Sequence, residues 1–95
     1  MKISEINETS RNITLRATII DKADFNLENP DRRPCSKITL DDGENRIFFW
    51  MWDMNDIKSL SVGDAILIEN AYARLDRDQQ LTISLNRQGG KVTKL

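Results

Sequence analysis

The sequence predicts an all-β domain, built as one small barrel of five short strands with a single short helix. Two observations predict this class. Several segments of the 95-residue chain alternate apolar and polar residues with a period of two, which is typical of strands that bury one face. Helical spacing is found once, between the third and fourth of these segments. Apolar residues make up 39% of the chain, which is enough for one core and one domain over residues 1–95.

The first predicted strand covers residues 12–21, with the sequence NITLRATIID. Its odd-numbered positions from Ile13 to Ile19 are apolar and would share one face. Residues 22–35, KADFNLENPDRRPC, contain two prolines, two asparagines and two arginines without any period. This composition predicts a long surface loop, and a loop of that length in a small domain is usually functional or mobile.

The next two strands are predicted to form an antiparallel hairpin. Residues 36–41 alternate, and Asp41-Asp42-Gly43 supplies the residue types of a tight turn. The following strand is the run RIFFWMWD, residues 46–53, which holds four of the six aromatic residues of the chain and both tryptophans. The hairpin therefore carries most of the aromatic surface.

A short helix is predicted directly after the aromatic run. Asp53 or Asn55 can cap its first turn, and Ile57 and Leu60 would share its apolar face. The sequence SVGD at residues 61–64 ends it after about two turns. The acidic residues of this segment are explained by the helix start, where negative charge is favourable.

Two more strands follow the helix. Residues 65–74 form the fourth, and the inward parity changes near Glu69-Asn70, so we expect a β-bulge there. Residues 81–85 alternate as the fifth strand, before Gly89-Gly90 and a short tail. The chain contains no internal repeat and no low-complexity segment.

This order of elements predicts an OB-fold, a five-stranded Greek-key barrel with a short helix between strands three and four. Other small five-stranded barrels share much of the pattern. An SH3-like barrel usually has only a single 3₁₀ turn near its end, so the position of the helix favours the OB-fold.

The residue types present predict no enzyme, no cofactor and no metal site. The chain has no histidine, no glycine-rich phosphate loop, and no nucleophile beside a recognisable base. Its one cysteine, Cys35, cannot form an internal disulfide and is expected to be buried or half-buried at the start of strand two. No stretch resembles a signal peptide or a membrane span, so we expect an intracellular, cytoplasmic protein.

The aromatic run presents different residues on its two faces. Ile47, Phe49 and Met51 fit the barrel interior. The other parity presents Phe48, Trp50 and Trp52. Rings two residues apart stand about 7 Å apart, close to the spacing of successive bases in an extended single strand, so this row can act as a stacking platform. The alternative is that the loop, the helix or a second subunit covers the tryptophans; a barrel this small has room for one face only, which favours a binding face.

The charge of the chain places a limit on electrostatic partners. Fourteen basic and fifteen acidic residues give a net charge of −1, so bulk positive charge cannot coat duplex DNA or a membrane. A local patch has to serve instead. The predicted fold groups these cations around the aromatic face: Arg16, Arg32, Arg33, Lys37, Arg46, Arg74 and Arg77.

In their order and spacing, five motifs resemble the single-stranded-DNA-binding OB domains of replication protein A, especially the archaeal proteins. They are KISEI, NITLRATIID, SKITLDDGENRIFFWMWD, SVGDAILIENAYAR and LTISLN, and they cover nearly the whole chain. The resemblance implies that Trp52 stacks on a base, and that Phe48 and Trp50 touch the strand beside it. It also implies contacts from strand one and the first loop, at Thr18, Lys22, Arg32 and Arg33.

One position departs from the family pattern. The second stacking aromatic of the family corresponds to Leu81, which can press against a base or sugar but cannot stack as a ring does. Leu81 also has the parity of Ile83 and Leu85, so it can equally belong to the core. Trp50 would then extend the platform along strand three, or the domain would bind more weakly and rely on companion modules.

The sequence therefore predicts a domain that binds single-stranded DNA without strong sequence preference, as one module of a longer chain serving replication, repair and recombination. Two alternatives stay open. One is a protein-interaction or oligomerisation OB domain whose aromatic face is covered by a partner. The other is an RNA- or tRNA-binding OB domain, which differs mainly in recognition of the 2′-hydroxyl.

Overall fold

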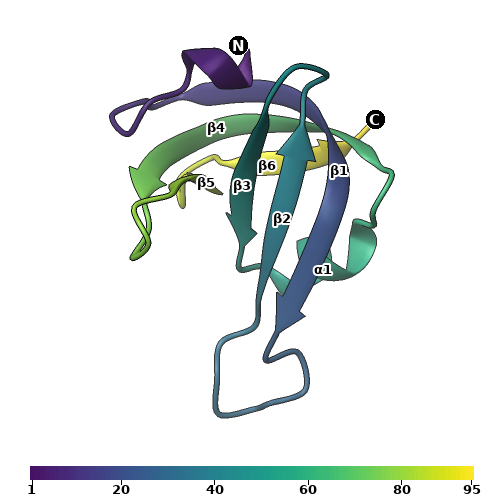
Figure 1. Ribbon diagram of the computed structural model, residues 1–95. Coiled ribbons are helices and arrows are strands. Elements are labelled where there is room, and N and C mark those ends of the chain that lie inside the picture. The colour runs from purple at the N-terminus through teal and green to yellow at the C-terminus, as the bar shows by residue number, and fades with distance from the viewer.

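The computed structural model describes residues 1–95 and contains six strands, one α-helix and one 3₁₀ turn (Figure 1). In chain order the elements are η1 (Ile3–Glu5), β1 (Ile13–Phe25), β2 (Cys35–Asp41), β3 (Arg46–Met51), α1 (Met54–Ser59), β4 (Ala65–Leu75), β5 (Leu81–Leu85) and β6 (Lys91–Lys94). No helix is long and apolar enough to span a membrane.

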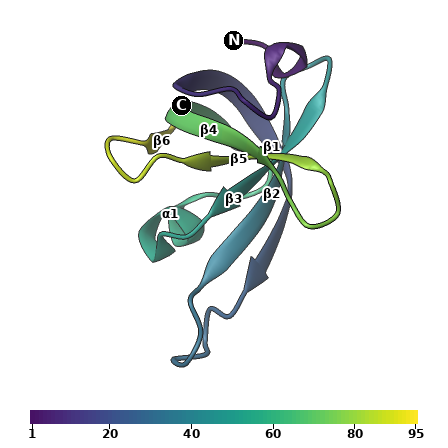
Figure 2. The same ribbon diagram turned by 90° about the vertical axis from the view of Figure 1, so that its left-hand side faces the viewer.

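The strands close into a barrel with the predicted OB-fold architecture. Their order in the sheet is β1-β2-β3-β5-β4-β6, and β1 also pairs with β4, which closes the cylinder. Only the β3–β5 pairing is parallel. The helix α1 lies at the lower end of the barrel, and both views show the β1–β2 loop projecting away from it (Figures 1 and 2).

The core contains the inward parity of each strand, as the alternation predicts. Eighteen buried apolar residues form one cluster. On β3 the inward residues Ile47, Phe49 and Met51 are at most 5% exposed. Ile57 and Leu60 join the same cluster from α1 and its end, which confirms the predicted apolar face of the helix. This core holds the outward face of β3 in a defined position.

Local signals at the helix and in β4 are also confirmed. Asp53 is the N-cap of α1, and its Oδ1 accepts hydrogen bonds from the backbone N–H groups of Asn55 and Asp56 at 2.9 and 3.1 Å. In β4, the pairing with β1 gains one residue at the predicted bulge, where Asn70 has a positive φ of 54°. The bulge moves the inward parity of β4 by one residue.

The first strand is longer than the sequence predicts. It runs to Phe25, so the β1–β2 loop covers only residues 26–34 rather than 22–35. The register with β2 shifts between Ile19 and Asp21, which marks a bulge at Ile20. After this bulge the inward positions are polar, and this hides the strand from a search for alternating hydrophobic residues.

Lys22 occupies one of these inward positions. Its Nζ donates hydrogen bonds to the carbonyl oxygens of Ile57 and Leu60, the latter at 2.8 Å, and lies 3.7 Å from a carboxylate oxygen of Asp24. A cation at the C-terminal end of a helix satisfies its last carbonyls and complements the helix dipole. Lys22 therefore attaches α1 to β1, and its prediction as a loop residue is wrong.

The C-terminal tail also forms structure that the sequence analysis did not predict. Residues 91–94 are β6, which pairs antiparallel with the first half of β4. Val92 packs against the core. The turn between β5 and β6 is closed by Gly90 N–H donating to the carbonyl of Asn86 at 3.0 Å.

Candidate nucleic-acid interface

The outward faces of β1, β2 and β3 form one continuous surface whose rows are given by the strand pairing. Thr39 pairs with Phe48, and Lys37 pairs with both Ala23 and Trp50. Phe25 pairs with Cys35 at the end of the sheet, next to the position where the chain leaves β3 at Trp52. Residues paired across strands share a face, so Phe48 and Trp50 of β3 lie on the same side as Phe25.

We call Phe25, Phe48, Trp50 and Trp52 the aromatic cluster. The ring centroids of Trp50 and Trp52 are 5.9 Å apart with an angle of 21° between planes, and those of Phe25 and Trp50 are 6.2 Å apart at 35°. A base inserted between two rings needs about twice the 3.4 Å stacking distance, so none fits between the tryptophans as they stand. The rings of Phe25, Trp50 and Trp52 therefore form one joint platform rather than a row of separate slots.

Cations lie directly over this platform. Lys37 Nζ is 4.1 Å from the ring centroid of Phe48 and 5.7 Å from that of Trp50, and the Arg33 guanidinium carbon is 5.0 Å from that of Trp52. Neither cation takes part in an ion pair. Cation–π attraction holds each charge over a ring without neutralising it.

A groove of about 740 Å³ runs beside the two tryptophans. Lys37 lies on one side of it, and the end of β4 with the β4–β5 turn forms the other side through Arg74, Leu75 and Arg77. Asp76 and Asp78 also line it, so this wall carries both signs of charge. The predicted cations Arg74 and Arg77 are therefore brought to the aromatic cluster.

A smaller hollow of about 480 Å³ surrounds Phe48. Its lining residues include Thr39, Arg46, Gln80 and Leu81. Leu81 is half-buried and packs against the core cluster while also lining this hollow. Leu81 therefore packs on the core at the rim of the barrel, and its contact with a base or sugar stays a prediction.

Several predicted site residues lie away from the two tryptophans or are held by other groups of the protein. Thr18 pairs with Asp41 at the opposite end of the sheet, and Arg16 lines the same hollow of about 370 Å³ as Thr18. The Nε of Arg46 is 3.2 Å from Oδ2 of Asp41. Lys22 is occupied by the carbonyls of α1.

One residue of the cluster, Phe25, and two residues beside it were missed by the sequence analysis. Phe25 was assigned to the loop. A bulge in β1 places Ala23 and Phe25 on the outward face of the sheet. Tyr72 and Arg87 line a further hollow of about 470 Å³ beside Trp52. Nothing in the local sequence marks Arg87, because its position depends on how the β5–β6 turn folds back over β4.

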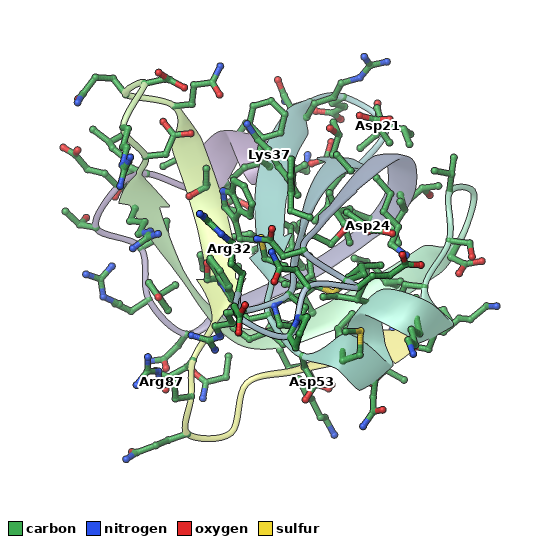
Figure 3. The ribbon with its side chains drawn as sticks, turned by 90° about the horizontal axis from the view of Figure 1, so that it is seen from below. Asp21, Asp24, Arg32, Lys37, Asp53 and Arg87 are labelled. Carbon is green, nitrogen blue, oxygen red and sulfur yellow. The ribbon has the colours of Figure 1, made fainter.

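Acidic and basic residues are interleaved around the cluster, since Asp76 and Asp78 line the groove with Arg74 and Arg77. In Figure 3, Lys37, Arg32 and Arg87 run from the upper middle to the lower left of the view, and Asp21 and Asp24 lie to the right. Burial raises the pKa of the Cys35 thiol, and Arg33 lowers it by a smaller amount. The buried thiol is thereby kept protonated and adds no charge, so the positive charges beside the cluster come from Lys and Arg.

Comparison with known proteins identifies structural relatives only. No family model matches the sequence, and no curated protein matches it. Schizosaccharomyces pombe Pot1pC bound to the single-stranded DNA CGGTTACGGT has a TM-score of 0.68 at 16% identity, over 98% of this chain and 84% of that one. A structure of fission yeast Pot1 with single-stranded DNA scores 0.69, and the chain spans only 38% of it.

Two further solved structures share the fold. The replication factor A related protein of Methanobacterium thermoautotrophicum has a TM-score of 0.70 at 16% identity, over 100% of this chain and 89% of that one. A hypothetical protein from Arabidopsis thaliana scores 0.78 at 11% identity, over 100% of this chain and 72% of that one. At these identities the likeness establishes the fold, and the chain is an OB-fold domain.

Proposed function

We propose that this domain binds single-stranded DNA without strong sequence preference. The observation that carries the proposal is the position of Lys37 and Arg33 over aromatic rings of one sheet face, with no acidic partner for either. Bases stack on the joint surface of Trp50 and Trp52, and phosphates contact the cations around it. Both interactions are indifferent to base identity.

The local charge distribution supports this proposal in spite of the net charge of −1. Arg74 and Arg77 face Lys37 across the groove, so a strand lying on the tryptophans has cations on both sides. Trp52 keeps 37% of its surface exposed, which leaves a ring free for a base. Duplex DNA binds poorly, because paired bases do not offer their faces to the platform.

The structural relatives add support for the class of ligand. Both fission yeast structures contain single-stranded DNA, and the archaeal relative is related to a replication factor. We extend the proposal to a role in replication, repair and recombination, with this domain as one of several OB modules in a longer protein. Additional modules increase the affinity through effective concentration.

The experiment is a titration of fluorescein-labelled oligo-dT of about 12 nucleotides, followed by anisotropy at about 50 and 200 mM salt. Oligo-U and duplex DNA of the same length are titrated alongside. Contact with about four phosphates gives a slope of log K against log salt near −3. The double variant Trp50→Ala/Trp52→Ala is expected to lose most of the binding, and the exposed-residue variant Val62→Ala serves as the control.

Three outcomes contradict the proposed ligand or the proposed binding face. A failure of the wild-type domain to bind oligo-dT at low salt, together with dimers in light scattering, indicates an interaction module. Tighter binding to oligo-U than to oligo-dT indicates an RNA-binding domain that recognises the 2′-hydroxyl. Equal binding by the double variant and Val62→Ala would place the DNA elsewhere on the surface.

A further inference from the structure

The hollow of about 470 Å³ beside Trp52 lies outside the groove assigned above. It is bounded by the end of β3, the outward side of β4 and β5, and the β5–β6 turn. We propose that this hollow is an additional nucleotide subsite, in which the strand continues past Trp52 and its phosphate is bound by Arg87 and Arg74. This inference rests on the proposed single-stranded DNA binding and adds a part of the path to it.

The hollow is continuous with the groove. Trp50, Trp52 and Arg74 line both, so a strand that leaves the groove at Trp52 enters the hollow directly. A backbone that continues from the groove along Trp52 and Arg74 reaches Arg87 of the β5–β6 turn, which lines the hollow.

The hollow contains groups suited to a phosphate. Arg33, Arg74 and Arg87 line it, and none of them is in an ion pair. A guanidinium presents a planar fork of donors that matches two phosphate oxygens, and it keeps its charge at all relevant pH values. Arg87 and Arg74 are exposed, so both can reach a phosphate without displacing the core.

The opposite side of the hollow carries carboxylates. Asp53 and Asp56, at the start of α1, line it together with the three arginines. Carboxylates repel a phosphate, so the backbone is directed toward Arg74 and Arg87 and the base is directed toward α1. Carboxylate oxygens also accept a hydrogen bond from an N–H group of a base, such as N3–H of thymine. The charges therefore give the nucleotide one orientation.

The test compares Arg87→Ala with Lys91→Ala. Lys91 is four positions further along the chain, carries the same charge, and lies 3.7 Å from Glu69 in an ion pair outside the hollow. Each variant is titrated with oligo-dT over a series of lengths, from about 4 to about 16 nucleotides, at several salt concentrations. Thermal unfolding of both variants checks that the fold is retained.

Loss of one phosphate contact by Arg87→Ala makes the salt slope less steep by about 0.7, which is about 8-fold weaker binding at about 50 mM salt relative to 1 M. This loss is expected for long oligonucleotides and not for the shortest. As the oligonucleotide is lengthened, the affinity of the variant then stops rising at a shorter oligonucleotide than the affinity of the wild type does. Lys91→Ala is expected to match wild type throughout.

The outcomes separate the subsite from the proposed function. If the wild type binds oligo-dT and Arg87→Ala equals Lys91→Ala at every length, the strand does not enter the hollow and only this inference is overturned. If Arg87→Ala weakens the binding of oligo-dT equally at every length, the contact of Arg87 does not depend on the length of the strand, and the subsite is also overturned. If the wild type binds no oligo-dT, the proposed function fails first.

Discussion

The two ends of the outward face of β1, β2 and β3 carry similar residue types and differ in what their cations contact. At the hairpin end, Arg46 pairs across the strands with Asp41, and their side chains are 3.2 Å apart. At the aromatic end, Lys37 has Ala23 and Trp50 as its strand partners, and its ammonium lies over rings. The strand pairing thus decides which cation is neutralised and which keeps its charge available for a ligand.

The largest effect on binding is expected from the aromatic end. Trp52→Ala removes the exposed tryptophan ring of the platform, and loss of one stacked base costs about 1–3 kcal/mol, or about 5- to 150-fold in affinity. Anisotropy with labelled oligo-dT measures the change. Val62→Ala, which also truncates an exposed apolar side chain, is the control. Equal affinities of Trp52→Ala and Val62→Ala would show that Trp52, although exposed, does not contact the DNA.

The largest effect on stability is expected from the inward lysine of β1. Lys22→Met removes the hydrogen bonds from Nζ to the carbonyls of Ile57 and Leu60, and Met keeps the apolar stem. Because the side chain of Lys22 is still 15% exposed, we expect the lower end of the usual range for bonds to a charged group, about 1.5 kcal/mol in free energy of unfolding. Chemical denaturation measures it.

Lys37→Met is the matched control for that measurement, because it makes the same change on the opposite face of the sheet. It should leave the free energy of unfolding nearly unchanged, since Lys37 donates to no buried carbonyl. DNA binding should behave in the opposite way, with little change for Lys22→Met. A stability loss shared by both variants would show that the carbonyl contacts of Lys22 contribute nothing specific.

Lys22 also shows where sequence reasoning about this fold stops. The helix cap at Asp53 and the β4 bulge at Asn70 were predictable, because local residue types and a change of parity mark them. The last part of β1 was not, since its inward positions hold Lys22 and Asp24, which satisfy each other and α1 rather than a hydrophobic core. Such a strand is visible only once its partners are in place.

The candidate site likewise has one part that the sequence predicts and one part that it does not. Parity places Phe48 and Trp50 on the outward face, and the structure confirms that position. The contact between Trp50 and Phe25 depends on the bulge at Ile20, and the place of Arg87 depends on the β5–β6 turn. Sequence patterns predict individual β-strands well. Side chains that an irregular turn or bulge brings together can be identified only from the tertiary structure.

A smaller effect on binding separates the two ends of the sheet through single cations. Lys37→Met is expected to reduce the salt slope by about 0.7 and to weaken binding at about 50 mM salt by about 8-fold relative to 1 M. Arg46→Met is expected to change neither value, because Asp41 already neutralises Arg46. Salt titrations with oligo-dT measure both variants.

Asp41→Asn then tests whether pairing is the cause of the difference. The substitution keeps an oxygen for the Gly43 N–H, which Asp41 Oδ1 accepts at 2.6 Å, and removes the charge that holds Arg46. An exposed ion pair contributes little stability, so the fold is retained. Binding is expected to tighten and the slope to steepen by up to about 0.7. No change would mean that the strand never reaches the hairpin end.

The smallest expected effects are on the melting temperature as the pH changes, and the two ends of the sheet are expected to respond with opposite signs. At the hairpin end, backbone N–H donors from Asn45, Ile3 and Glu44 hold the pKa of Asp42 below its usual 3.8. A lowered pKa in the folded state stabilises the fold above about pH 4, and that contribution is lost as the pH falls through the folded value. Asp42→Asn should therefore lower the melting temperature at neutral pH and weaken its decline in acid.

Asp56, at the start of α1, is expected to respond in the opposite direction. Burial raises its pKa, and the nearby charge of Asp53 raises it further. The charged form then costs stability above the folded pKa, and this cost disappears as the pH falls through that value. Asp56→Asn should raise the melting temperature at neutral pH and leave it unchanged in acid. Melting curves from about pH 2 to pH 7 compare the two variants, and a lower melting temperature for Asp56→Asn at neutral pH would mean that its charge stabilises α1 instead.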